Sequence, residues 1–363
     1  MPAGRPQTLK ARCLIDLGFP FHRTESPAER MRAIAEEIEA GGDEWEIYAS
    51  GPYAEALEAR IAALTGKPAA LWLPTGTMAQ GIAARIHCDA AGRDELALHP
   101  TSHLILHEQD SAVHVHGLKP RMIGEWSSAL NAGDIPASAG CAIIELAQRQ
   151  NGGLLPAWDV LEALKARAAE LGVALHMDGA RLWALPGAYE GRSHAQICDG
   201  FSSVYVSLYK DLGAISGAVL AGDEDFIAAA RIWRARMGGT LPIALPNIAD
   251  ALARLDALLA EMPAYIARAG ELASAINAIS GLTVSPPKTN LFHIEVNASI
   301  DRINQARDHV AQTKGIWLFS RCWDYPEQAC PAIEMTVGGK MLDIEPKLII
   351  DGYSLFAETL GEV

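Results

Sequence analysis

The feature that most constrains the fold is a repeated exchange of short apolar runs and helical stretches between residues 70 and 222. The apolar runs cover residues 70–73, 96–99, 142–146, 173–177, 203–208 and 218–221. Helical patterns at 77–87 and 157–171 lie between some of them. Runs that are apolar throughout, without alternating polar positions, are typical of strands buried on both faces. The sequence therefore predicts an α/β domain whose mostly parallel sheet is covered by helices.

Segments on both sides of this core predict further elements. Helical patterns at 27–41 and 54–65 precede it, and each is closed by a glycine, the usual signal at the end of a helix. After residue 223 we expect helices at 224–236, 245–278 (broken near Pro263), 299–312 and 344–359, and strands around 282–285, 291–296 and 332–336. We interpret 1–30 as an N-terminal arm, 31–245 as a large domain and 246–363 as a smaller α+β domain.

The composition excludes several classes of partner. The chain carries 30 Lys and Arg against 44 Asp and Glu, a net charge of −14, without basic clusters. Nucleic-acid binding needs clustered cations, so no nucleic-acid partner is expected. No apolar run approaches the ~20 residues that span a bilayer. The six cysteines are scattered, without the spacing of a zinc or redox motif. We therefore expect a cytoplasmic protein that binds neither membranes nor nucleic acid.

The stretch LPTGTMAQ, residues 73–80, leads from an apolar run through a glycine into a helical pattern. Free backbone N–H groups at the start of a helix, together with the helix dipole and a threonine hydroxyl, suit a phosphate group. Gly76 and Thr77 are the candidate ligands. An ordinary strand-to-helix turn capped by a threonine explains the same residues equally well.

Two other apolar runs end in charged residues. Asp178 follows the run at 173–177, and Lys210 follows the run at 203–208. Ligands of open α/β sheets bind beyond the carboxyl ends of the strands. Burial there lowers the pKa of a lysine, which frees its amine to attack a carbonyl group. The alternatives are an aspartate that caps the next helix and a lysine that points to solvent.

A histidine-rich stretch raises the question of a metal site, since imidazole and carboxylate groups are zinc ligands. Its candidate ligands are His99, His103, His107, Glu108, Asp110, His114 and His116. Their spacing matches no compact zinc motif convincingly. We expect no metal, and we expect one of these histidines to work in an active site.

Together and in this order, these segments resemble the threonine aldolase / aromatic amino acid β-eliminating lyase family of pyridoxal-phosphate (PLP) enzymes. The resemblance runs from about Tyr48 to Gly239, and its best segments are LPTGTMAQ, SHLILHEQD, LHMDGARLW and VSLYKDLGAISGAVLAG. It implies the type I fold of PLP-dependent transferases, with a large PLP-binding domain and a smaller α+β C-terminal domain.

The resemblance also implies roles for the matching residues. Lys210 corresponds to the lysine that holds PLP covalently as an imine. Asp178 corresponds to the carboxylate that keeps the pyridine nitrogen protonated, so that the ring can accept electrons. Gly76 and Thr77 correspond to phosphate ligands.

Three further residues match positions near the substrate. His103 corresponds to the histidine that stacks on the cofactor ring and moves protons at the substrate hydroxyl, and Glu108 to an acid behind it. Arg181 corresponds to an arginine near the ring and the substrate. The family usually has serine directly before the lysine, whereas this chain has Tyr209, so we expect Ser207 to bind the phosphate instead.

The residues for the substrate carboxylate depart further from the family. The family's stretch ENTHN reads ELAQR at 145–149, so Gln148 replaces a second active-site histidine. Glu334 stands in the C-terminal stretch AIEMTV, where the family has an arginine. PLP enzymes need a cation to orient the α-carboxylate. We expect Arg149 or Arg181 to supply it, with Gln148 beside the substrate.

The reaction that the resemblance implies is cleavage of the Cα–Cβ bond of a threonine-like β-hydroxy-α-amino acid to glycine and an aldehyde. The alternatives are β-elimination or transamination of another amino acid, and a catalytically weak PLP-binding protein, because the carboxylate-binding residues differ. The stretch YASGP at 48–52 lies where the family has an active-site loop from the neighbouring subunit. A homodimer or homotetramer is therefore expected.

Overall fold

The computed structural model describes residues 8–18, 25–42 and 44–361, which divide into two compact units. The first unit comprises residues from 25 to 260, and the second joins the residues after 260 to the N-terminal segment 8–18. The division therefore falls inside helix α10 (Leu245–Asn277), whereas the sequence analysis expected it at 245/246. Helix α1 (Pro27–Ala40), expected to begin in the arm, belongs to the first unit.

The first unit is built on a seven-stranded sheet in the order β2-β8-β7-β6-β5-β3-β4. Its strands are β2 (Ala69–Leu73), β3 (Glu95–Leu98), β4 (Lys119–Met122), β5 (Cys141–Glu145), β6 (Ala174–Gly179), β7 (Ser203–Ser207) and β8 (Ala218–Gly222). Strand β8 runs antiparallel to both neighbours, β2 and β7, and every other pairing is parallel. The predicted mostly parallel sheet is confirmed.

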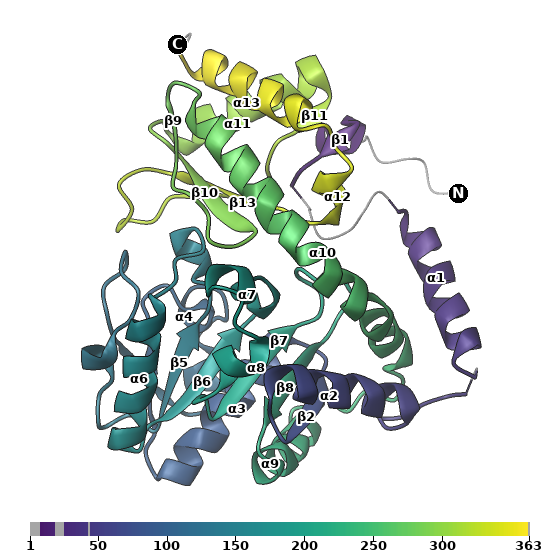
Figure 1. Cartoon of the computed structure of the whole chain (residues 1–363), viewed down its shortest axis with the longest axis vertical. Coiled ribbons are helices and arrows are strands. Elements are labelled where there is room, and N and C mark those ends of the chain that lie inside the picture. The colour runs from purple at the N-terminus through teal and green to yellow at the C-terminus, as the bar shows by residue number, and fades with distance from the viewer. Residues whose placement is uncertain (1–7, 19–24, 43, 362–363) are drawn as a thin grey trace. The chain divides into compact units, whose positions relative to one another are not determined.

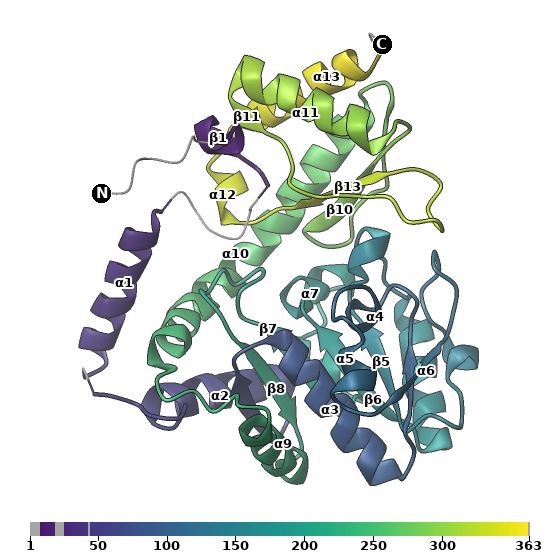
Figure 2. The same cartoon turned by 180° about the vertical axis from the view of Figure 1, so that it is seen from behind.

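Helices cover both faces of this sheet (Figures 1 and 2). Helices α3 (Gly76–Ala91) and α9 (Glu224–Arg236) share one face, where Ile82 and Phe226 join the same buried cluster as Leu71. The other face carries α2 (Pro52–Thr65), α6 (Trp158–Leu171) and α8 (His194–Cys198). Short helices α4 (His103–Leu106), α5 (Ser111–His114) and α7 (Leu185–Ala188) lie in the connections.

Local signals explain where these helices begin. Ser26 and Glu29 form a reciprocal capping box at the start of α1, with Pro27 at its first position. Thr75 caps α3 by accepting a hydrogen bond from the Met78 amide at 3.2 Å. The start of α3 is thereby fixed at Gly76, directly after β2.

The second unit contains a four-stranded antiparallel sheet in the order β12-β13-β10-β9. Its strands are β9 (Leu282–Val284), β10 (Leu291–Val296), β12 (Cys322–Trp323) and β13 (Ala332–Thr336), and its helices include α11 (Ile300–Lys314), α12 (Gly339–Leu342) and α13 (Pro346–Gly361). A separate parallel pair joins β1 (Ile15–Asp16) to β11 (Ile316–Trp317). This pairing is why the N-terminal segment belongs to the second unit.

The expected break of α10 near Pro263 does not occur, because the helix runs through this residue. A proline removes one backbone hydrogen bond from a helix. Pro263 is exposed, whereas Leu258, Met262 and Tyr265 are buried along one face. We infer that burial of this face offsets the lost bond. None of the described helices is both long and apolar enough to cross a membrane.

Candidate active site

Lys210 lies in the loop that follows β7, as the sequence predicts. The backbone turns directly after it, because the Gly213 amide donates to the Lys210 carbonyl at 2.9 Å. Gly213 has φ = +67°, a conformation that favours glycine. Burial of the amine and the nearby Arg181 charge lower the pKa of Lys210, and the charges of Asp178 and Glu145 oppose this shift. More of the amine is therefore uncharged near neutral pH than in an ordinary lysine.

Asp178 lies near the carboxyl end of β6 and is 3% exposed. It pairs in register with Glu145 on β5 and Tyr205 on β7. It therefore lies between these two strands, at the edge formed by the carboxyl ends of the parallel strands. One carboxylate oxygen, Oδ1, accepts a hydrogen bond from the Ala180 amide at 3.1 Å. A buried carboxylate held in this way can pair with a cationic group placed beyond the strand end.

Glu145 is a site residue that the sequence analysis did not select. Its Oε1 accepts a hydrogen bond from the Arg149 amide at 3.0 Å and lies 3.9 Å from Nη1 of Arg181. Burial and the charge of Asp178 raise the pKa of Glu145, while Arg181 opposes the rise. The available signal was a carboxylate at the end of the predicted strand 142–146, the same signal that pointed to Asp178.

At the predicted phosphate turn, the backbone of Gly76 passes close to the side chain of Tyr205. A Cβ atom on Gly76 would lie 2.2 Å from the hydroxyl oxygen of Tyr205, so only glycine fits there. Thr77 is exposed in the first turn of α3, and the capping threonine is Thr75. Ser207 is fully buried at the end of β7, and its hydroxyl interacts with that of Tyr205.

The imidazole of His103 is hydrogen-bonded to the carboxylate of Glu108. Nδ1 of His103 lies 2.9 Å from Oε1 of Glu108, whose other oxygen accepts from Oγ of Ser111 at 3.1 Å. The Glu108 side chain is 1% exposed and that of His103 is 29% exposed. Since Nδ1 donates to the carboxylate, Nε2 of His103 carries the lone pair that can accept a proton. The ring of His107 is 5.1 Å away, between centroids.

The remaining histidines of this stretch have other surroundings. His99 is bonded to Thr101 at 2.7 Å and to the Glu125 carbonyl at 2.9 Å, and His114 is exposed. His116 packs against Trp233 with 6.0 Å between ring centroids. Within the described ranges, no three His, Cys, Asp or Glu side chains are arranged to hold a metal ion.

Gln148 and Arg149 lie after β5 and are both buried. Oε1 of Gln148 accepts a hydrogen bond from Nδ2 of Asn151 at 3.1 Å, within the same loop. The charge of Arg149 acts on Lys210, as does that of Arg181. Both arginines therefore lie in the electrostatic environment of the amine.

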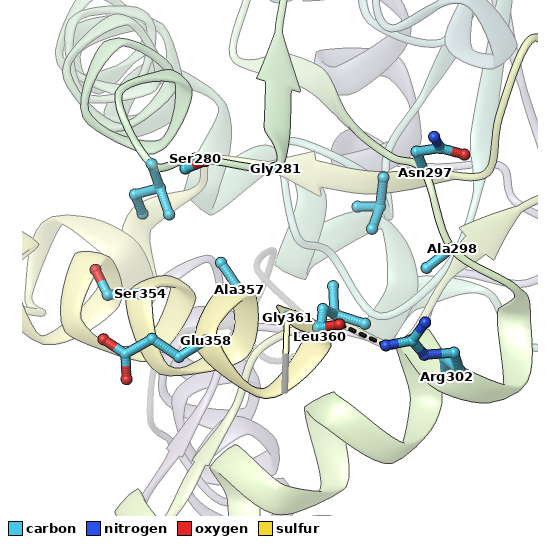
Figure 3. A pocket seen from close by; sticks show the side chains of 12 residues that line it. Ser280, Gly281, Asn297, Ala298, Arg302, Ser354, Ala357, Glu358, Leu360 and Gly361 are labelled. Carbon is cyan, nitrogen blue, oxygen red and sulfur yellow. Dashed lines mark hydrogen bonds between the residues drawn. The ribbon is translucent and has the colours of Figure 1, made fainter. Parts of the chain in front are cut away.

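A separate cavity of about 600 Å³ lies in the second unit (Figure 3). At one side of it, Arg302 donates a hydrogen bond to the Leu360 carbonyl. Its lining also includes Asn297, Ser354 and Glu358. It contains none of the site residues predicted from the sequence, all of which belong to the first unit.

A family model described as beta-eliminating lyase matches residues 23–299 of the chain. The chain belongs to the beta-eliminating lyase family. The low specificity L-threonine aldolase of Escherichia coli (strain K12) is 31% identical over 232 residues, which cover 60% of this chain and 67% of that protein. The family expected from the sequence is therefore confirmed.

Solved structures extend this likeness over nearly the whole chain. The crystal structure of a candidate L-allo-threonine aldolase from Listeria monocytogenes EGD-E is 33% identical, with a TM-score of 0.87, and the match covers 97% of this chain and 98% of that one. Sphingomonas wittichii serine palmitoyltransferase, 14% identical, has a TM-score of 0.73 with 96% and 88% covered, and shows the fold alone. These structures confirm the predicted type I fold of PLP-dependent transferases.

Proposed function

We propose that this member of the beta-eliminating lyase family is a PLP-dependent carbon–carbon lyase. It cleaves the Cα–Cβ bond of a threonine-like β-hydroxy-α-amino acid to give glycine and an aldehyde. The likeness to the Escherichia coli L-threonine aldolase and to the Listeria protein supports this substrate class. The observation that carries the proposal is the meeting of the Lys210 amine, with its lowered pKa, and the buried Asp178 carboxylate at one sheet edge.

The residues of the first unit fit PLP. The buried Ser207 hydroxyl and the amides at the start of α3, where Gly76 leaves the backbone without a side chain, suit a phosphate group, with Thr77 contributing. Asp178 suits the pyridine nitrogen, and Lys210 the covalent link. When bound, PLP supplies a protonated ring that takes up the electron pair of the broken bond.

Each residue around the substrate then has its own role in the reaction. Nε2 of His103 takes the proton of the β-hydroxyl, while Glu108 holds the imidazole by its Nδ1 and stabilises the charge it acquires. Asp178 keeps the proton on the pyridine nitrogen. The carboxylate of Glu145 lies 3.9 Å from Arg181 and balances part of its charge.

The substrate carboxylate requires a cation, and we propose Arg149 or Arg181 for this role, with Gln148 beside it. Arg149→Ala and Arg181→Ala separate the two, because removing the binding cation should raise the apparent dissociation constant for glycine at least tenfold. The measurement is the change in absorbance of the imine band on titration with glycine. An unchanged dissociation constant in one variant rejects that arginine.

We also propose that the chain acts as a homodimer or homotetramer. Trp45, Ile47 and Tyr48 are 76%, 55% and 53% exposed, an apolar group beside the stretch at 48–52. Tyr48→Asp should lower the molar mass measured by light scattering, because a carboxylate at an apolar interface is costly to bury. An unchanged mass would reject this surface as the contact between subunits.

The experiment for the function is incubation of purified holoenzyme with threonine and with allo-threonine. We expect equal amounts of glycine and acetaldehyde, no ammonia, and loss of at least 99% of the activity in Lys210→Ala. Borohydride reduction followed by peptide mapping should place the label on Lys210. Ammonia with a 2-oxo acid would favour β-elimination instead, and a bound cofactor without product would favour a PLP-binding protein.

A further inference from the structure

We propose that the buried ion pair between Arg30 and Asp250 is a positioning pair for the Lys210 amine. The inference rests on the proposed function, since it assigns to two distant residues the task of holding the loop that bears the lysine. Arg30 lies on α1 and Asp250 on α10, 220 positions apart in the sequence. Nη1 of Arg30 lies 3.2 Å from Oδ1 of Asp250, and each residue is 4% exposed.

Both members of the pair bind the backbone of the lysine loop directly. Nη2 of Arg30 donates to the Gly213 carbonyl at 2.8 Å. Oδ2 of Asp250 accepts from the Ile215 amide at 2.8 Å. Gly213 in turn donates its amide to the Lys210 carbonyl at 2.9 Å. Gly213 is therefore the single residue that links the ion pair to the Lys210 carbonyl.

The same loop is tied to the predicted phosphate turn. Oγ of Ser216 donates to the Pro74 carbonyl at 3.2 Å, and Pro74 lies two residues before Gly76. A displacement of residues 213–216 would thus change the position of the lysine and of the turn together. Misplacement of a reacting group by about 1 Å costs on the order of a hundredfold in rate.

The charges around the pair favour a positioning role. Arg254 donates to Oδ1 of Asp250 at 2.8 Å, and Glu25 lies 2.9 Å from Arg30 and 3.3 Å from Arg254. Two arginines and two carboxylates thereby compensate one another. A buried ion pair stabilises a fold little more than apolar residues of similar volume would. Its directional bonds to Gly213 and Ile215 are what apolar side chains could not supply.

The test compares Arg30→Met, Arg30→Lys and Asp250→Asn with a matched control, Arg60→Met. Arg60 lies on α2 and forms an ion pair with Asp256 on α10. The side chains of Arg60 and Asp256 are 46% and 80% exposed, so this pair is not buried. In each purified holoenzyme, the rate at which glycine displaces Lys210 is followed by absorbance. Thermal midpoint, kcat and KM are measured on the same samples, and hydrogen exchange reports on amides 211–217.

Arg30→Met should slow displacement of the lysine by about ten- to a hundredfold, lower kcat more than it raises KM, and speed exchange at 211–217. Arg30→Lys and Asp250→Asn should be intermediate, since each keeps part of the bonding. Arg60→Met should match the wild type in all three.

Rates within twofold of the wild type in Arg30→Lys and Asp250→Asn, with unchanged exchange at 211–217, would overturn the inference even if Arg30→Met fails to fold. Equal losses in Arg60→Met would overturn it too, because they would mark a general effect of helix packing. Failure of the proposed function is distinguishable: the wild-type protein itself would then show no imine on Lys210, and both proposals would fall together.

Discussion

Gly76 is a residue at which the structure leaves no room for a side chain. A Cβ atom there would lie 2.2 Å from the Tyr205 hydroxyl and 2.7 Å from its ring carbon Cζ. Gly76→Ala should therefore move the start of α3 and raise the apparent dissociation constant for PLP at least tenfold. The measurement is fluorescence titration of the cofactor into each variant.

The double variant Gly76→Ala with Tyr205→Phe serves as the control for this prediction. Removing the hydroxyl relieves the shorter of the two contacts but leaves the one to Cζ, so affinity should be regained only in part. Affinity in Gly76→Ala equal to that of the wild type would show that the close approach to Tyr205 does not govern PLP binding.

Glu108 carries a second prediction at the residue scale. Glu108→Gln keeps an acceptor near Nδ1 of His103 but removes the charge that stabilises the protonated ring. We expect kcat for threonine cleavage to fall about ten- to a hundredfold, with less change in KM, because the interaction strengthens as the proton is transferred. Steady-state kinetics on threonine check this. A rise in KM with an unchanged kcat would assign Glu108 to substrate binding.

At the scale of elements, a buried hydrogen-bonded chain joins α3, β6 and β7. Oγ of Ser203 lies 2.7 Å from Nε2 of His87 and 2.7 Å from Nδ1 of His176. Nε2 of His176 lies 2.9 Å from Oε1 of Gln80. Because Gln80 offers an acceptor here, His176 donates from Nε2 and accepts from Ser203, which in turn accepts from His87. The bond from Ser203 to Nδ1 of His176 requires a neutral imidazole, because a protonated ring has no lone pair there.

This chain predicts a loss of stability in acid. Burial lowers the pKa of His87 from 6.5 to about 4 and that of His176 to about 3. The unfolded chain therefore binds more protons below pH 6.5, so the free energy of unfolding should fall as the pH drops toward 4. Each ring contributes at most about 1.4 kcal/mol per pH unit. Urea unfolding between pH 7 and 4.5 measures the slope.

His87→Gln tests the origin of that slope. Glutamine keeps a donor toward Ser203 but does not titrate, so the variant should lose roughly one ring's share of the pH dependence. A slope equal to that of the wild type would assign the acid lability to carboxylates elsewhere.

The helices and buried strands of the first unit could be predicted because their apolar patterns are local. Helices 27–41 and 54–65 and the strand at 203–208 were expected within two residues of α1, α2 and β7. Strand β4 was missed because its residues, KPRM, form no apolar run and are mostly exposed. The break at Pro263 was wrong because burial along α10 outweighs a local signal.

The site was predictable to the extent that its residues end strands. Asp178 and Lys210 follow apolar runs, and the structure brings their charges together at one edge of the sheet. The Arg30–Asp250 pair gave no signal, since its members are 220 positions apart and ordinary on their own helices. The hydrogen bonds of Ser203 and His176 also gave no signal in the sequence, because they join different elements. The sequence shows only that both residues lie in strands.

At the scale of the whole molecule, the N-terminal segment 8–18 pairs with strand β11 of the second unit. The amides of Leu14 and Leu17 donate to the carbonyls of Gly315 and Trp317 at 2.9 Å each. Removing residues 1–18 should therefore speed hydrogen exchange at 314–320 at least tenfold, because the edge of β11 loses its partner. Exchange at 203–207, in the first unit, should not change. Uniformly faster exchange in both units would show instead that the whole chain is destabilised.

The place of β8 in the sheet also determines when the site can form during synthesis. Strand β2 has β8 as its single neighbour in the seven-stranded sheet, and β8 alone joins it to β7. The turn at Gly76 is made early, but it meets the Lys210 loop only after residue 222 has left the ribosome. At about 5–20 residues per second, that delay is on the order of 10 s. We therefore expect the phosphate turn and the lysine loop to come together only after β8 has been synthesised.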